Sequence, residues 1–187
     1  HRVEEASPGF DVAGLDQNYN RIFAVGAAAN IRLRARAIGR EPDPDGFERV
    51  TWAMVELASR ISAPDYVQML NRLHGISREI AAFFETYDVL LTPTLAEPPV
   101  ELGVLDMMSE DLEAYSERLW RFTPFTYPFN VTGQPAMSVP LAWNGDGLPI
   151  GVHFVGRYGE EATLFRLAGQ LEAARPWADR RPPEPFA

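Results

Sequence analysis

Apolar residues recur in the first third of the chain at the spacing of a helical face. They follow this spacing from about Asp11 to Ile38, and Gly39 is placed to end the helix. A second helix is predicted from Phe47 to Arg60. Residues 41–46 lie between the two helices and contain two prolines, which lack an amide donor. This stretch is therefore predicted to be a surface turn.

A third, longer helix is predicted next, and a strand directly follows it. Ser62 and Asp65 have the spacing of a capping box, and the apolar stripe beyond them continues to about Thr86. Residues 87–92 are a short β-branched and aliphatic run closed by Pro93, which is typical of a buried strand leading into a loop. Helix followed by strand indicates an α/β layer.

The C-terminal half adds a rigid loop, a hairpin and two helices. Residues 92–99 contain three prolines, and a helix is predicted from Ser109 to about Phe122. Residues 137–142 and 149–155 flank two Asx-Gly pairs, which favour a tight turn, so they are predicted to pair as a β-hairpin. The last helix is expected from about Glu160 to Ala174, with acidic residues at its start.

Composition indicates one folded domain and excludes several classes of partner. The 187 residues are 46% hydrophobic and 23% charged, which is ordinary for a globular protein. The net charge of -9 argues against nucleic acid as a partner. The one basic run, Arg32, Arg34, Arg36 and Arg40, lies near a predicted helix end, where cations complement the helix dipole. No apolar stretch approaches the roughly 20 residues that span a bilayer, so we expect no membrane partner and a cytoplasmic location.

Two missing residue types restrict the chemistry further. The chain has no cysteine, and all 17 residues counted as Lys+Arg are arginines, so neither a thiolate nor a lysine base is present. The histidines His1, His74 and His153 do not have the spacing of metal ligands, so no metal site is expected. The chain begins at His1 without a methionine, which suggests a piece of a longer protein.

Three separated motifs carry a family resemblance. The strings TYDVLLTPTLAEPP, FNVTGQPAMSVPL and DGLPIGVHFVGRYGEEATLFRLAGQLEAARPW occur in this order. Together they resemble the C-terminal part of the amidase signature family, from about Asp65 to Trp177, and more narrowly its branch of 6-aminohexanoate cyclic dimer hydrolases. The resemblance implies an α/β fold, with a mixed β-sheet flanked by helices and a C-terminal β-hairpin and helix. It also implies hydrolysis of carbon-nitrogen bonds in amides without a metal or organic cofactor.

The catalytic unit of that family is not found in this chain. It consists of a serine nucleophile, a second serine in a cis peptide and a lysine base, with backbone amides as the oxyanion hole. Here there is no lysine, and none of the seven serines lies in a glycine-serine cluster. The resemblance therefore implies that residues 1–187 are one partial domain, inactive alone, whose N-terminal catalytic portion is absent. Its partners would be that portion and a small-molecule amide.

The resemblance also implies which residues lie nearest the substrate cleft. In this family the C-terminal part completes the sheet and supplies one wall of the cleft. The residues predicted to form that wall are Thr92, Pro93, Thr94, Thr126, Tyr127, Phe129 and Asn130. The alternative is that these residues only pack and cap the turn that follows. Thr123 stands where tRNA-dependent amidotransferases carry an acidic residue, which argues against that role.

Three other interpretations remain open. The chain could be a stand-alone binding module that docks a partner or a second copy as a homodimer, or a catalytically dead remnant. A fragment should expose an apolar face and a sheet edge, whereas a module should have a sealed core. A symmetric hairpin would also make Ser138 and His153 cross-strand neighbours, and therefore candidates for a serine-histidine dyad.

Overall fold

The computed structural model describes residues 1–181, in which the long helices come first and two of the three strands come late. The helices are α1 (Val12–Ile38), the short 3-10 helix η1 (Pro44–Gly46), α2 (Arg49–Ser59), α3 (Ala63–Phe83), α4 (Leu112–Phe122), α5 (Tyr127–Thr132) and α6 (Glu161–Ala174). The strands are β1 (Val89–Pro93), β2 (Ala136–Trp143) and β3 (Pro149–Gly156). No helix among these residues is both long and apolar enough to cross a membrane.

The three strands form one sheet in the order β1-β3-β2, so the last strand in sequence lies in the middle. β2 and β3 are the predicted hairpin, and β1 pairs with the other side of β3. Every pair in residues 1–181 is antiparallel. The register of the hairpin shifts between Pro140 and Ala142, on an outer strand, where a residue without an amide hydrogen is tolerated. The predicted α/β class is confirmed.

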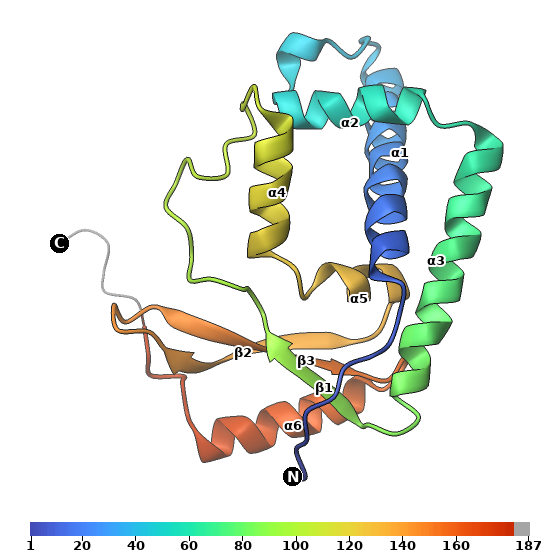
Figure 1. Cartoon of the computed structure of the whole chain (residues 1–187). Coiled ribbons are helices and arrows are strands. Elements are labelled where there is room, and N and C mark those ends of the chain that lie inside the picture. The colour runs from blue at the N-terminus through green and yellow to red at the C-terminus, as the bar shows by residue number, and fades with distance from the viewer. Residues whose placement is uncertain (182–187) are drawn as a thin grey trace.

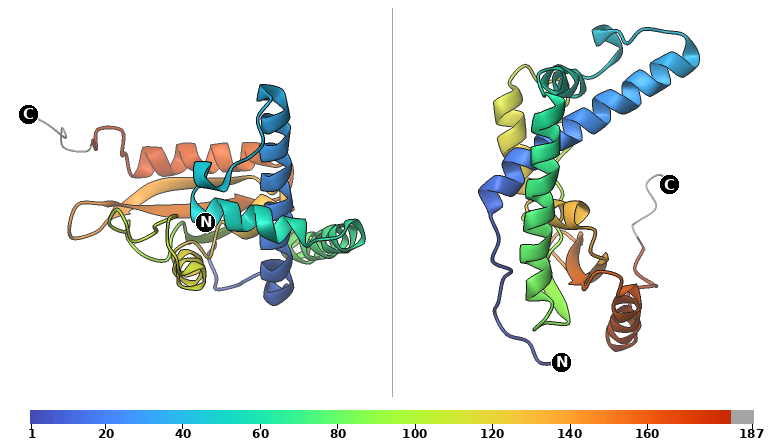
Figure 2. Two further views of the ribbon diagram at one scale, coloured as in Figure 1. Left: turned by 90° about the horizontal axis from the view of Figure 1, so that it is seen from above. Right: turned by 90° about the vertical axis from the view of Figure 1, so that its right-hand side faces the viewer.

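The sheet separates the helices into two layers. α6 lies on one side of it, and α1 to α5 lie on the other (Figures 1 and 2). Successive residues of a strand point to opposite faces, and β3 follows this rule. Val155 joins the core beneath α3 and α5, whereas Phe154 joins Leu164 in the core beneath α6. His153, two residues before Val155, therefore faces the α5 layer.

Most predicted helix boundaries are confirmed by observed caps. Asp11 accepts a hydrogen bond from the amide of Gly14 at 2.9 Å, and Gly39 ends α1 in the left-handed conformation, with φ of 64°. Ser62 caps α3 by accepting from the amide of Asp65 at 3.3 Å. α4 begins at Leu112 rather than at Ser109, because the side chain of Asp111 caps it.

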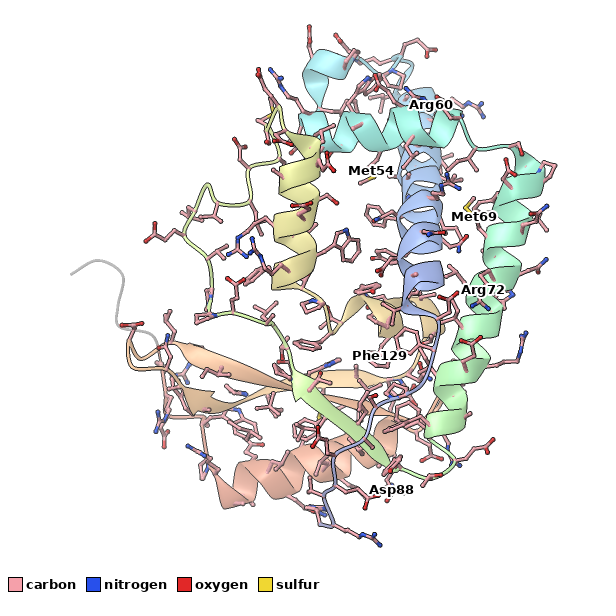
Figure 3. All side chains as sticks on the ribbon, viewed as in Figure 1. Met54, Arg60, Met69, Arg72, Asp88 and Phe129 are labelled. Carbon is pink, nitrogen blue, oxygen red and sulfur yellow. The ribbon has the colours of Figure 1, made fainter. Side chains whose placement is uncertain are left out.

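The short helix α5 was not expected from the sequence. It has six residues, too few to show a helical period, and it ends at Gly133 with φ of 74°. Phe129 of this helix is buried, and Figure 3 shows it between α5 and the sheet. α5 therefore closes the sheet face from above and sets the position of the residues beside it.

Large apolar side chains lie on the surface. Phe165 is 78% exposed, Tyr158 72% and Leu91 55%. Within residues 1–181 the outer strands β1 and β2 each pair on one side only. An exposed apolar surface and open sheet edges are the features expected of a fragment, because a sealed core would cover them.

Candidate functional site

A polar row crosses all three strands on the face toward α5. Thr92 of β1 and Ser138 of β2 both pair with His153 of β3 in the register of the sheet. The ring of Phe129 lies over this row, 5.7 Å from the imidazole centre and tilted by 52°. The sheet thus gathers two hydroxyl groups and one imidazole that are far apart in sequence.

His153 is buried, and its orientation is set by Thr92. The Oγ1 atom of Thr92 lies 3.0 Å from Nδ1 of His153 and donates its own hydrogen to the carbonyl of Pro93, also at 3.0 Å. A hydroxyl carries a single hydrogen, so with that hydrogen on the Pro93 carbonyl we assign Nδ1 as the donor to Thr92. Burial also lowers the pKa of His153 below its usual value of 6.5, which keeps the ring neutral at pH 7. The proton of the neutral imidazole is therefore on Nδ1.

Two hydroxyl groups meet across the central strand where it carries a glycine. Thr94 Oγ1 and Ser138 Oγ are 2.6 Å apart, although β3 runs between β1 and β2. A Cβ on Gly151 would lie 2.6 Å from the first oxygen and 2.7 Å from the second, inside van der Waals contact. Gly151 is thus required because the hydroxyls occupy the space of a side chain.

A hollow of about 340 Å³ opens beside these groups. Its lining contains polar and apolar side chains but, among the described residues, no acidic side chain, no arginine and no lysine. The lining residues are Thr94, Thr126, Phe129, Asn130, Gln134, Ala136, Met137, Ser138 and His153. Six of these nine residues are polar, and hydrogen-bonding groups that converge on a hollow beside apolar side chains are the features of a site for a small uncharged molecule.

The structure brings four of the seven predicted wall residues to this hollow: Thr94, Thr126, Phe129 and Asn130. Thr92 does not line the hollow, but it bonds to His153, which does. Pro93 is exposed at the end of β1 and does not line it.

Tyr127 turns away from the hollow. Its hydroxyl donates to Asp16 of α1, and its ring centre lies 4.8 Å from Trp120 and 5.4 Å from Tyr19. Burial, and then the bond to the Asp16 carboxylate, raise the pKa of Tyr127 well above its usual value. Tyr127 thus joins α5 to α1 and α4.

The loop after β1 is fixed to α4. Arg118 holds Glu97 through two parallel hydrogen bonds of 2.9 Å, and the amide of Ala96 donates to the carbonyl of Phe122 at 3.1 Å. A two-bond arginine-carboxylate pair has a defined geometry. The amide of Thr94 also donates a hydrogen bond to the carbonyl of Gly151 at 3.0 Å. This hydrogen bond and the Arg118–Glu97 pair keep Thr94 at the edge of the hollow.

The serine-histidine dyad is not formed. Ser138 and His153 are cross-strand neighbours as predicted, yet neither side chain bonds to the other: His153 bonds to Thr92 of β1, and Ser138 bonds to Thr94, which directly follows β1. No group of three or more potential metal ligands occurs in residues 1–181.

A second hollow, of about 400 Å³, lies away from the sheet between the end of α1 and α2. Arg32, Arg36 and Arg40 line it together with Trp52. The three arginines are exposed near the end of α1, as the sequence predicts for cations near a helix C-terminus.

Comparison with known proteins agrees with the sequence motifs. The family profile described as Amidase matches residues 1–165. The 6-aminohexanoate-cyclic-dimer hydrolase of Paenarthrobacter ureafaciens is 35% identical over 189 residues, covering 97% of this chain and 38% of that protein. The putative amidase AmiC of Mycobacterium leprae is 36% identical over 178 residues, covering 95% of this chain and 37% of that protein.

A solved structure of a 6-aminohexanoate cyclic dimer hydrolase is similar over nearly the whole chain. Its TM-score is 0.89 at 34% identity, and the match covers 97% of this chain and 39% of that one. This chain therefore spans less than two fifths of the length of these relatives.

Proposed function

Because this chain belongs to the Amidase family, we propose that it is part of an enzyme that hydrolyses carbon-nitrogen bonds of non-peptide amides. The observation that carries the proposal is the match to a cyclic dimer hydrolase structure along 97% of the chain, at a TM-score of 0.89. Agreement in both backbone and sequence over that length supports a shared activity of the whole enzymes.

In this proposal the chain supports catalysis and does not perform it. The family's base is a lysine, and the chain has none, so the serine-serine-lysine unit belongs to the portion of the relatives that the chain does not span. The proposed roles of this C-terminal part are to complete the sheet and to form one wall of the substrate cleft. The chain alone is then inactive.

The proposed wall is the hollow over the polar row. Phe129 would pack against the apolar part of the amide, while Thr94, Thr126 and Asn130 would orient it through hydrogen bonds. Pro93 and Tyr127 would contribute indirectly, by ending β1 and by anchoring α5 to α1.

The first test compares this chain, the full-length enzyme and a mixture of the chain with the separately produced remainder. Ammonia or amine release is followed over a panel of aliphatic, aryl and cyclic amides. We expect release from the full-length enzyme and from the mixture but none from the chain alone. Release by the chain alone would reject the supporting role, and a full-length enzyme inert toward every amide would favour the binding module.

The wall is tested in the full-length enzyme by Asn130→Ala. Loss of one hydrogen bond to an uncharged substrate group should raise KM by up to about tenfold. Asn71→Ala, on the exposed side of α3, is the matched control and should leave KM unchanged. Equal KM values for the two variants would remove Asn130 from the proposed wall.

A further inference from the structure

The second ring nitrogen of His153, Nε2, has no hydrogen-bond partner among the described residues, whereas Nδ1 is engaged with Thr92. In the same part of the chain, no fully buried side-chain nitrogen or oxygen lacks a partner. Nε2 must therefore reach accessible space, and His153 lines the hollow. Since the proton is on Nδ1, Nε2 presents a lone pair there.

The opposing polar groups supply a hydrogen-bond donor. Thr94 and Ser138 carry one hydroxyl hydrogen each, and their mutual bond uses only one of the two. The other hydrogen is available to an acceptor in the hollow. Thr94, Ser138 and His153 all line the hollow, so this donor and the Nε2 acceptor belong to the same site.

We propose that Nε2 of His153 accepts a hydrogen bond from an N–H of the substrate, and that this hollow therefore selects an uncharged amide group over a carboxylate. The inference rests on the proposed function and names the substrate class of the same site. A carboxylate would place its oxygen lone pairs against the lone pair of Nε2, where the described lining residues provide no arginine or lysine to offset its lost hydration. An amide offers an N–H to Nε2 and a carbonyl to the spare hydroxyl hydrogen.

The test uses three substrates built on an amide that the full-length enzyme hydrolyses. They share the scissile end and differ only at the remote end, which is a primary amide, a dimethylamide or a carboxylate. The dimethylamide keeps the carbonyl but has no N–H. We expect kcat/KM for the primary amide to exceed that for the dimethylamide by about tenfold, the effect of one hydrogen bond. The carboxylate should be the poorest substrate.

Variants of the full-length enzyme assign the preference to His153. His153→Phe removes the acceptor and should bring the ratio of the two amides close to one, whereas His153→Gln retains an acceptor and should keep a severalfold ratio. His74→Phe, on the exposed side of α3, is the matched control and should leave the ratio unchanged. Because the ratio compares two substrates on one enzyme, it is insensitive to the amount of folded protein.

The pH dependence of substrate preference provides a second readout. A purely structural role of His153 would not make the preference between amide and carboxylate change with pH. The neighbours of the ring, Thr92, Ser138 and Phe129, do not titrate, and His153 is the one titratable residue that lines the hollow among the described residues. Burial places the pKa of His153 below 6.5. The preference for the primary amide over the carboxylate should therefore persist at neutral pH and fall in acid, when Nε2 gains a proton and becomes a donor.

The outcomes separate the two proposals. A full-length enzyme that hydrolyses no amide overturns the proposed function itself. An active enzyme whose amide ratio is the same in His153→Phe as in the unaltered protein overturns only the role of His153. A ratio that falls in His153→Phe and survives in His153→Gln supports it.

Discussion

Gly151 shows how one missing side chain shapes the site. The Thr94 and Ser138 hydroxyls lie 2.6 Å apart over this residue, in the space that a Cβ would occupy. Their contact depends on a residue that takes no part in it. A single methyl group at Gly151 would therefore separate the Thr94 and Ser138 hydroxyls.

Gly151→Ala should lower both stability and activity. A methyl group 2.6 Å from Thr94 Oγ1 must push β1 and β2 apart or break their hydroxyl bond, which should cost about 1 to 3 kcal/mol. The thermal midpoint and kcat/KM of the full-length enzyme measure this. Gly169→Ala in α6, where nothing lies within 4 Å of the added methyl, is the control. It should instead raise stability by up to about 1 kcal/mol, and similar losses in the two variants would contradict the steric argument.

Some residues of the site could be predicted from sequence and others could not. The pairing of Ser138 with His153 was predicted from a symmetric tight hairpin, and the structure reaches it through the register shift between Pro140 and Ala142, which is also local. The hydrogen-bond partners of these side chains are not local, because Thr92 lies on β1 and Thr94 directly follows it. The same holds for Tyr127, whose hydroxyl bonds to Asp16, 111 residues away. No spacing in the sequence signals such a contact.

At the scale of elements, the start of α1 is tied to α3 by charged groups. Asp11 caps α1 and pairs with Arg72 at 2.5 Å, and Arg72 also contacts Glu79 at 3.3 Å. Figure 3 shows Arg72 on α3 beside the start of α1. The amide of Asp11 donates to Glu79 at 3.1 Å, so backbone and side chain of one residue connect the two helices.

Asp11→Asn should destabilise the protein in a pH-dependent way. The hydrogen bond from Arg72, and then that from the Gly14 amide, lower the pKa of Asp11 below 3.8. A carboxyl group with a lowered folded pKa stabilises the protein above its unfolded pKa and loses this effect as pH falls through the folded value. The difference in thermal midpoint between the two proteins, followed by circular dichroism, should therefore be constant near neutral pH and shrink below pH 3.8.

Glu56→Gln is the control for this experiment. It removes one exposed charge of α2 that forms no ion pair among residues 1–181. It should change the midpoint little across the same pH range. If the Asp11→Asn difference did not shrink in acid, the ion pair would not be its cause.

Elements differed in how well the sequence predicted them. Long amphipathic helices with capping residues, such as α1 and α3, were predicted to within a few residues because period and caps agree. α5 was missed because six residues around Pro128 have no period to detect. The hollow depends on α5, so its shape could not be predicted, although four of the seven residues proposed from the sequence for a cleft wall line it.

At the scale of the whole molecule, the exposed edge of the sheet predicts how the chain behaves alone. β1 pairs only with β3 in the described residues, and Leu91 on it is 55% exposed. An open apolar edge strand is a template for pairing with another chain. We therefore expect the isolated chain to self-associate as its concentration rises, in sedimentation velocity experiments.

Leu91→Lys should reduce that self-association, because a charge on an edge strand opposes strand addition. Leu102→Lys is the matched control, since Leu102 is fully exposed in the loop before α4 and outside the described strands. It should leave self-association nearly unchanged. Equal reductions would point to general surface hydrophobicity and not to the β1 edge.

The position of β3 has a consequence for synthesis on the ribosome. The middle strand of the sheet is translated last, and His153 follows its partner Thr92 by 61 residues. Helices α1 to α3 can dock on one another while the chain is still growing, because α1 contacts both α2 and α3 and all three have been made once Phe83 has emerged. β1 cannot pair until β3 has been made, because β3 is its partner in the sheet. The entropy cost of closing the intervening loop is then offset by the pairing. The polar row is thus assembled only after β3 has been made, and a nascent chain stalled before Pro149 would hold β1 and β2 without the strand that joins them.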